Sequence, residues 1–229
     1  TAEMGSPITQ SRTIQATVPL VMMDEHSLAA RHLVKWTELR QSASGNALVR
    51  RLPKGVAAKN LPVVIHPHGG PWARDTWGYS PYPQFLANRG YAVLQPNFRS
   101  SSGYGKEFLN AGNKQWGKRM QDDLTDAAGW VIAQGYADPK RLGFFGASYG
   151  GYAALMGAVT QGDRFKCAVN WVGVTDIGLM SSIHWSDFSE EWKNYGMKRL
   201  VADPDTDAAQ MRQTSPLARA AEIRMPLLM

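Results

Sequence analysis

Residues 146–151, Gly-Ala-Ser-Tyr-Gly-Gly, restrict the fold of this chain more than any other segment. The apolar run at 141–145 leads into them, and a stretch rich in Ala and Gly follows at 152–159. This pattern predicts a strand, a sharp turn and a helix, with Ser148 at the tip of the turn. Gly146 and Gly150 suit the turn because side chains there would collide with the neighbouring strand and helix. We therefore expect Ser148 at the carboxyl end of a sheet, in a strained backbone conformation.

A serine in this position is a candidate nucleophile for acyl transfer. The N-terminus of the following helix favours the negative charge that develops in that reaction. The backbone N–H of Tyr149, the next residue, can donate a hydrogen bond to the same charge. The alternative is an ordinary helix-capping serine in a Gly-rich turn. We interpret Ser148 as a catalytic residue and Tyr149 as an oxyanion-hole donor.

A second motif, His-Pro-His-Gly-Gly-Pro-Trp at 66–72, directly follows the apolar β-branched run at 62–65. Paired glycines let backbone N–H groups approach a ligand oxygen, so this loop can supply half of an oxyanion hole. His66 and His68 could instead bind a metal, but no cysteine or third histidine lies near them in the sequence. We expect neither a metal nor a cofactor.

Strand-like and helix-like segments alternate from residue 61 onward. We predict strands at 62–65, 91–94, 141–145 and 165–172, with another beginning at 225. We predict helices at 82–88, 120–132 and 152–159. Alternation of this kind indicates βαβ units and a mainly parallel sheet.

Residues 1–60 carry weaker signals, and we predict two parts: a leader of uncertain structure at 1–60 and a partial catalytic domain at 61–229. The net charge of +6 arises in the leader, because seven basic residues and one acidic residue lie between 31 and 60. These basic residues are scattered and lack interleaved aromatic residues, so we expect no nucleic-acid partner. No apolar run approaches the ~20 residues that span a bilayer, so we expect no membrane partner.

Cys167 is the only cysteine, which excludes a disulfide within the chain. It lies in the apolar run at 165–172, where we expect a buried, inert thiol. The first residues show no basic start followed by an apolar stretch, so no secretory signal is visible. We expect a cytoplasmic protein, with a periplasmic or secreted one as the alternative if a signal has been lost.

Taken together, the motifs resemble the catalytic domain of the prolyl oligopeptidase family of serine peptidases, and most of all its acylaminoacyl-peptidase and dipeptidyl-peptidase branches. The matching segments are HGGP at 68–71, NFRSSSGYG at 97–105, DD at 122–123, DPKR at 138–141, GASYGGY at 146–152 and MPLL at 225–228. The resemblance implies an α/β-hydrolase fold: a mostly parallel sheet with helices on both faces, here cut short at its C-terminus.

The resemblance also implies roles for individual residues. Gly70 and Tyr149 would supply the oxyanion-hole N–H groups. Support of the site would come from His68, Gly69, Gly146 and Gly150. The segment at 97–105 and the pair Asp122 and Asp123 would support the site without taking part in the chemistry.

A nucleophilic serine needs a base, and the base needs a carboxylate to orient it. In α/β-hydrolases both follow the serine, the acid first. Only one histidine, His184, follows Ser148. Asp203 and Asp205 are candidates for the acid by order, but their segment is typical of a turn. By the resemblance, the acid follows the strand that begins at 226 and the histidine comes later, so we expect both beyond Met229.

These observations predict a serine peptidase that hydrolyses short peptides through an acyl-enzyme on Ser148, inactive as this 229-residue fragment. One alternative is a carboxylesterase of the same fold, because fold and catalytic residues do not fix the leaving group. Another is a non-catalytic remnant or binding fragment. We expect a peptide substrate, and a homo-oligomer stays open.

Overall fold

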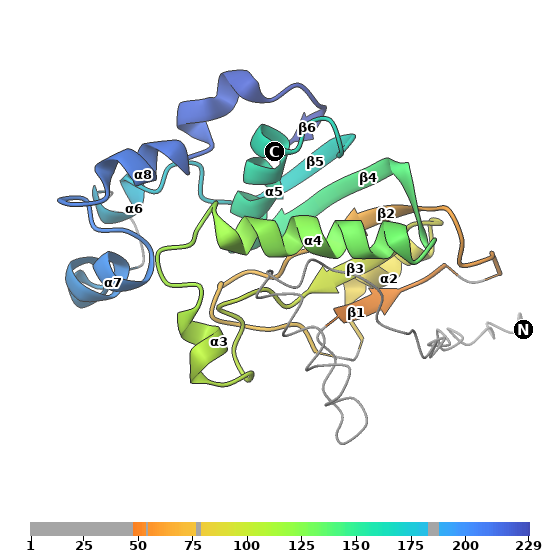
Figure 1. Ribbon diagram of the computed structural model, residues 1–229, viewed down its shortest axis with the longest axis horizontal. Helices are drawn as coiled ribbons and strands as arrows, with labels where there is room; N and C mark the ends of the chain where they lie inside the picture. The colour runs from red at the N-terminus through yellow and green to blue at the C-terminus, as the bar shows by residue number, and fades with distance from the viewer. Residues whose placement is uncertain (1–47, 54, 77–78, 183–187) are drawn as a thin grey trace, which may run out of the picture.

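A six-stranded sheet organises the molecule, with the strands in the order β1-β3-β2-β4-β5-β6 (Figure 1). The computed structural model describes residues 48–53, 55–76, 79–182 and 188–229. The strands are β1 (Leu48–Arg51), β2 (Leu61–Ile65), β3 (Ala92–Pro96), β4 (Ala137–Ala147), β5 (Cys167–Trp171) and β6 (Leu227–Leu228). β1 pairs antiparallel with β3, and every other pairing is parallel. Parallel pairing brings the carboxyl ends of β2, β3, β4 and β5 to one edge of the sheet.

Helices cover both faces of this sheet, as the sequence predicts. One face carries α4 (Arg119–Ala133) and α5 (Tyr149–Thr160), and the other carries α2 (Pro81–Ala87). Shorter helices follow β3 and β5: α3 (Lys106–Asn110), α6 (Leu179–Ser182), α7 (Lys198–Leu200) and α8 (Ala208–Gln213). A π-helical turn spans Trp192–Met197 and a 3₁₀ helix spans Leu217–Glu222. None of the helices in the described part of the chain is long and apolar enough to cross a membrane.

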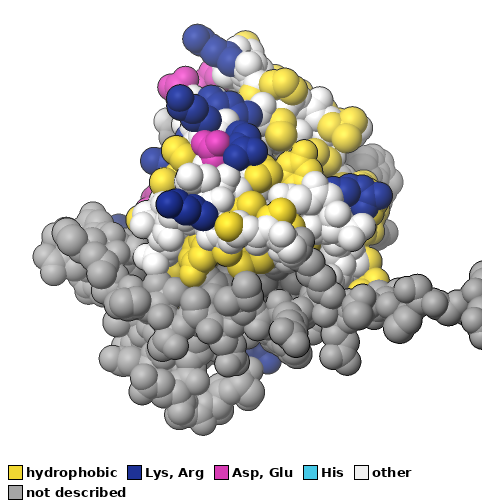
Figure 2. Space-filling view, turned by 90° about the vertical axis from the view of Figure 1, so that its right-hand side faces the viewer, with side chains coloured by type: hydrophobic (Ala, Val, Ile, Leu, Met, Phe, Trp, Pro, Cys, Tyr) yellow, Lys and Arg dark blue, Asp and Glu magenta, His cyan; other side chains and the backbone are white. Residues whose placement is uncertain are grey.

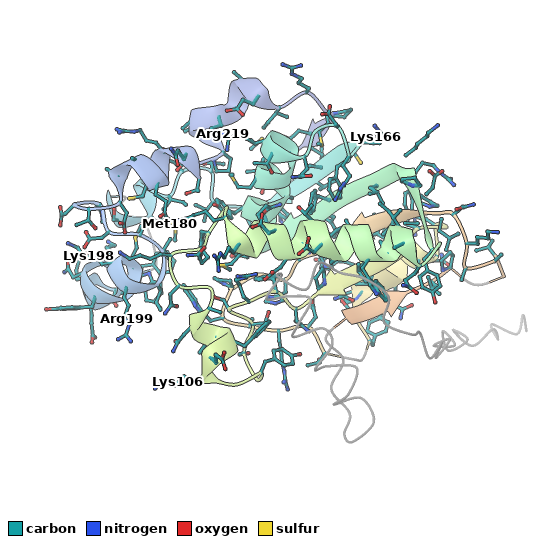
Figure 3. The ribbon with its side chains drawn as sticks, viewed as in Figure 1. Lys106, Lys166, Met180, Lys198, Arg199 and Arg219 are labelled. Carbon is teal, nitrogen blue, oxygen red and sulfur yellow. The ribbon has the colours of Figure 1, made fainter. Side chains whose placement is uncertain are left out.

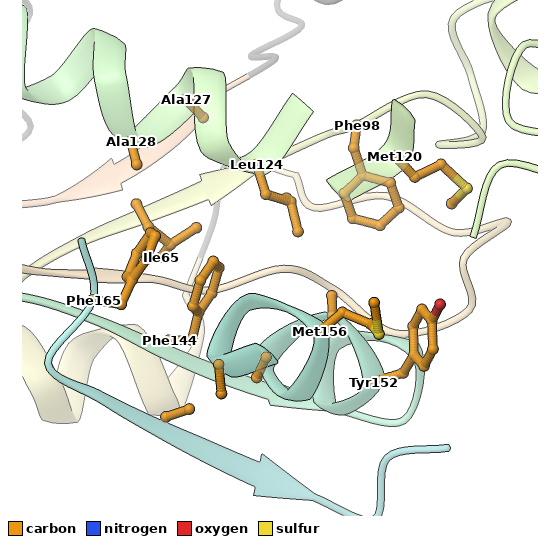
Figure 4. Close-up of a cluster of buried hydrophobic side chains, with 14 of the residues drawn as sticks. Ile65, Phe98, Met120, Leu124, Ala127, Ala128, Phe144, Tyr152, Met156 and Phe165 are labelled. Atoms are coloured by element: carbon orange, nitrogen blue, oxygen red, sulfur yellow. The ribbon is translucent and has the colours of Figure 1, made fainter. Parts of the chain in front are cut away.

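The main hydrophobic core lies between the sheet and the pair α4 and α5 (Figure 4). Leu124 of α4, Ile65 of β2 and Met156 of α5 meet there and are almost fully buried. Phe144 of β4 stacks on Phe165 with ring centroids 4.0 Å apart. Full burial of such side chains stabilises the fold by roughly 1.5–3 kcal/mol each. This core fixes α5 against β4, and the junction of those two elements carries Ser148.

The other face of β4, β5 and β6 is only partly covered among the described residues. Phe145, Val169 and Leu228 are neighbours across the three strands on this face. Trp171 stays 46% exposed and Leu228 65% exposed, although Tyr82 of α2 packs on both Phe145 and Trp171. We call Phe145, Val169, Trp171 and Leu228 the α2-side strip.

The prediction of a buried thiol at Cys167 is wrong, because its side chain is exposed. Successive residues of a strand point to opposite faces. In β5, Ala168 and Asn170 point toward α5 and are buried, so Cys167 points to the partly covered side. The apolar run is real, but it does not show which face of the sheet is covered.

Strand β1 lies in the segment for which the sequence predicts no element, and its residues 48–51 pair with 93–96 of β3. The division of the chain at residue 60 stays a prediction, and residues 1–47 lie outside the described part. On the face that lies to the right in Figure 1, Lys and Arg side chains are interspersed with hydrophobic and a few acidic ones (Figure 2). The absence of a nucleic-acid partner also stays a prediction.

Candidate active site

Ser148 occupies the junction between β4 and α5, in the strand-turn-helix arrangement that the sequence predicts. Its backbone has φ 57° and ψ −121°, a region that residues with a Cβ rarely adopt. Two backbone hydrogen bonds hold it there: Ser148 N donates to Trp171 O at 3.0 Å, and Tyr152 N donates to Ser148 O at 3.0 Å. The first bond anchors the turn to the end of β5 and the second begins α5.

The glycines around Ser148 allow close backbone packing. A Cβ on Gly146 would overlap the carbonyl of Gly150, and a Cβ on Gly150 would overlap the carbonyl oxygen of Pro67. The backbone atoms of the turn therefore pack closely against one another and against the loop at 66–72. The structure thus gives a physical reason for both glycines at the positions that the sequence singled out.

Gly69 lies directly beside the candidate nucleophile. A Cβ built on Gly69 would lie 3.4 Å from Ser148 Cβ and 3.8 Å from Ser148 Oγ. The backbone N–H groups of Gly70 and Tyr149 donate to no acceptor among the described residues. Two unengaged N–H groups beside a strained serine are what an oxyanion hole requires. The roles of Ser148, Tyr149 and Gly70 stay predictions, but their placement is consistent with them.

Neither histidine of the 66–72 loop forms a hydrogen bond with Ser148 Oγ among the described residues. His66 Nδ1 donates to Phe145 O at 2.7 Å, and the two rings stack at 4.8 Å. His68 Nδ1 donates to Gly69 O at 2.7 Å, and its Nε2 accepts from Ser101 Oγ at 2.8 Å. Burial lowers the pKa of both, and that of His68 to about 4. No group of three or more candidate metal ligands occurs in the described part of the chain.

The segment at 97–105 is tied to α4 by a buried ion pair. Arg99 donates to both carboxylate oxygens of Asp123, through Nε at 2.8 Å and Nη2 at 2.6 Å. The Arg99 backbone N–H adds a third bond at 2.9 Å. Burial opposes the charge on Arg99, but the hydrogen bonds and charge of Asp123 outweigh it and raise the pKa of Arg99. Asp123 thus supports this loop, whereas Asp122 is exposed.

Three aromatic side chains that the sequence reasoning did not single out surround Tyr149. Its ring contacts Trp116 at 4.7 Å, Phe98 at 5.2 Å and Tyr152 at 5.6 Å between centroids. Phe98 also stacks on His68 at 4.4 Å, so one ring contacts residues of both candidate oxyanion loops. Phe98 lies inside the 97–105 motif, but nothing in the sequence indicates that its side chain contacts His68 and Tyr149.

The two candidates for the acid downstream of Ser148 form no hydrogen bond with it. Asp203 and Asp205 lie in a turn and pair with Lys198 at 3.3 and 2.7 Å. Lys198 itself lies at the edge formed by α7 (Figure 3). His184 lies outside the described residues. Within the described part of the chain, no side chain forms a hydrogen bond with Ser148 Oγ.

Comparison with known proteins adds to this geometry. Residues 77–229 match the prolyl oligopeptidase family. Dipeptidyl aminopeptidase BIII of Pseudoxanthomonas mexicana is 42% identical over 218 residues, which is 92% of this chain and 30% of that protein. An acylamino-acid-releasing enzyme of Sus scrofa is 28% identical over 174 residues, 74% of this chain and 23% of that protein.

The solved structures agree with the sequence relatives. An acylaminoacyl peptidase in complex with Z-Gly-Gly-Phe-chloromethyl ketone superposes with a TM-score of 0.68 and 26% identity. The match covers 79% of this chain and 28% of that one. A puromycin-hydrolyzing peptidase of Mycobacterium tuberculosis gives a TM-score of 0.70 over 80% of this chain and 29% of that one. The chain therefore spans about a third or less of the length of these proteins, and their fold includes the sheet described above.

Proposed function

Because this chain belongs to the prolyl oligopeptidase family, we propose that it carries the nucleophile and the oxyanion hole of a serine peptidase that hydrolyses short peptides. The observation that carries the proposal is the strained turn of Ser148, with Gly69 packed against it and the N–H groups of Gly70 and Tyr149 without an acceptor in the described part of the chain. Peptide substrates are proposed because the relatives are named as peptidases.

In this proposal Ser148 Oγ attacks the carbonyl carbon of the scissile bond while a base takes its proton. The oxygen of the tetrahedral intermediate becomes an oxyanion and accepts hydrogen bonds from Gly70 N–H and Tyr149 N–H. Collapse breaks the C–N bond, the amine leaves with the proton held by the base, and an acyl ester on Ser148 remains. Water then hydrolyses the ester by the same steps and regenerates the hydroxyl.

We expect the proton to go to a group other than the histidines of the 66–72 loop, because neither forms a hydrogen bond with Ser148 Oγ among the described residues. His66 and His68 each use Nδ1–H for a backbone carbonyl, and the Nε2 of His68 already accepts from Ser101. We expect the base and its carboxylate to follow Ser148 along the chain, in the order that this fold uses. A cytoplasmic location and the oligomeric state stay predictions.

The test is covalent labelling of the natural polypeptide that contains these residues. A fluorophosphonate should modify Ser148, and mass spectrometry should find the adduct on the peptide with residues 146–151. Ser148→Ala should abolish both labelling and hydrolysis of peptide anilides. Ser181→Ala, which removes a half-buried hydroxyl of α6 that bonds the Gly178 carbonyl, should leave both intact. Turnover that persists in Ser148→Ala would contradict the proposal. Hydrolysis of p-nitrophenyl acyl esters without that of anilides would identify an esterase instead.

A further inference from the structure

The side chain of His68 forms a hydrogen bond with the peptide group that carries one of the proposed oxyanion donors, the N–H of Gly70. Its Nδ1 lies 2.7 Å from the carbonyl oxygen of Gly69, and a carbonyl can only accept, so Nδ1 carries the proton. That carbonyl and the N–H of Gly70 belong to the same planar peptide group. In a trans peptide the C=O and N–H point in opposite directions. Holding the Gly69 oxygen therefore fixes the direction of the Gly70 N–H.

This restraint matters at Gly69 and Gly70 more than elsewhere because glycine resists rotation so little. Gly70 has φ +117°, which glycine adopts readily and other residues do not. The backbone of two glycines does not by itself fix the orientation of the Gly69–Gly70 peptide, so contacts with other residues must fix it. Gly69 also lies against Ser148, so rotation of this peptide would change the direction of an N–H group close to the serine.

The imidazole is itself held in one tautomer and one orientation. Ser101 Oγ lies 2.8 Å from Nε2, and since Nδ1 carries the proton, the hydroxyl donates and Nε2 accepts. Phe98 stacks on the ring at 4.4 Å. The ring is buried and holds a neutral form across the pH range in which serine hydrolases work, since burial lowers its pKa to about 4.

The support continues into α4 through the same loop. Ser101 N donates to Phe98 O at 2.9 Å, and Ser102 N donates to Ala73 O at 2.9 Å. Arg99, between Phe98 and Ser101, is fixed by its three hydrogen bonds to Asp123. A continuous set of contacts therefore runs from α4 to the Gly69 carbonyl.

We propose that His68 is a positioning residue: its neutral Nδ1–H holds the Gly69 carbonyl so that the Gly70 N–H points to the developing oxyanion, with Ser101 fixing the tautomer. This inference rests on the proposed function and adds a distinct role to it. His68 neither takes the proton of Ser148 nor touches the substrate. Its contribution to rate comes through the orientation of one peptide group.

A matched pair of substitutions separates the two nitrogens. The amide nitrogen of an asparagine can replace Nδ1, whereas that of a glutamine reaches the place of Nε2. In the natural polypeptide, His68→Asn should therefore keep the hydrogen bond to the Gly69 carbonyl and retain kcat within a few-fold. His68→Gln should lose that hydrogen bond and lower kcat about 100-fold, which is the effect of removing one oxyanion-hole donor, with KM unchanged. Asp163→Asn, a change at an exposed position outside the site, serves as the control at wild-type activity.

Two further readouts decide between this role and others. The pH profile of His68→Asn should match that of the wild type, and complete loss of activity in that variant would overturn the proposal by indicating a proton-transfer role. Crystal structures should show the Gly69–Gly70 peptide rotated in His68→Gln and unrotated in His68→Asn. An unrotated peptide in His68→Gln would also overturn the proposal. These structures decide it even if Ser148→Ala retains turnover, a result that would overturn only the proposed function.

Discussion

At the scale of single residues, the turn that exposes the hydroxyl of Ser148 places its backbone in a strained conformation. A residue with a Cβ at φ 57° and ψ −121° costs roughly 1–3 kcal/mol relative to an unstrained conformation. The hydrogen bonds to Trp171 and from Tyr152 hold the backbone in place against that strain. A residue selected for stability alone would be a glycine.

This reasoning predicts opposite effects on stability and activity. Ser148→Gly should raise the free energy of unfolding by up to about 1 kcal/mol while it abolishes hydrolysis. Ser148→Ala retains the Cβ and should leave stability nearly unchanged, with the same loss of activity. Urea denaturation of the three proteins measures the difference. Equal stability of the Gly and Ala variants would show that the strain is negligible.

Asp75 provides a second prediction at the residue scale. Its Oδ2 is buried without a partner among the described residues, and its backbone is held by two hydrogen bonds with Asn97. Burial raises the pKa of Asp75 from 3.8 to about 6, and the Gln95 amide offsets only part of that rise. The charged carboxylate therefore destabilises the folded state above pH 6, and this cost is relieved as pH falls from 6 toward 4.

Asp75→Asn should accordingly be more stable than the wild type at pH 7, and the advantage should shrink at pH 5. Unfolding free energies from urea titrations at the two pH values give the comparison. Asp163→Asn, at an exposed position, serves as the control for the removal of one carboxylate. A stability difference for Asp75→Asn that is the same at both pH values would contradict the buried-carboxylate interpretation.

At the scale of elements, much of the sheet and its covering helices follows from the sequence. A short β-branched run at 62–65 favours a strand, and β2 forms there. Apolar residues at helical spacing in 120–132 favour a helix, and α4 forms there. The elbow is also predictable, because only a strand-turn-helix explains its glycines. β1 could not be found, since its pairing partner β3 lies 40 residues away and no local pattern marks it. The prediction of a buried thiol at Cys167 was wrong for a related reason. Strand alternation is visible in the sequence, but which face of the sheet is covered depends on distant elements.

The same limit applies to the candidate site. The sequence identified Ser148, Gly69 and Gly70 because their residue types suit the chemistry. It did not reveal that Ser101 bonds His68, because a hydrogen bond across 33 residues depends on the packing of two loops. It did not reveal the bond from His68 to the Gly69 carbonyl either, because that bond depends on the orientation of the His68 ring. Motifs therefore show which residues belong together, and only the fold shows which atoms meet.

The contact between α5 and β4 permits a prediction about glycine in helices. Gly157 of α5 faces Phe144, and a Cβ there would overlap the phenyl ring. Gly129 of α4 has no atom within 4 Å of the corresponding position. Gly129→Ala should therefore stabilise the protein by about 0.5–1 kcal/mol through helix propensity, while Gly157→Ala should destabilise it by about 1–3 kcal/mol through overpacking. Thermal unfolding of both variants tests this, and stabilisation by both would show that Phe144 moves aside freely.

At the scale of the whole molecule, the described residues cover the two faces of the sheet unequally. The face under α4 and α5 is closed, whereas the α2-side strip of Phe145, Val169, Trp171 and Leu228 is partly exposed. β6 is the last strand in the sheet order among the described residues. A contiguous apolar strip beside a strand edge favours association between molecules.

The 229-residue chain, prepared by itself, should therefore self-associate through this face. Leu228 is 65% exposed within the strip, and Leu217 is 57% exposed on the 3₁₀ helix at 217–222, outside it. Leu228→Lys should shift the chain toward the monomer in sedimentation velocity, because it places a charge where apolar surface would be buried. Leu217→Lys adds the same charge and removes a similar exposed side chain, so it should leave association nearly unchanged. If both substitutions act equally, net charge rather than the strip controls association, and the uneven covering of the sheet has no consequence for how the molecules meet.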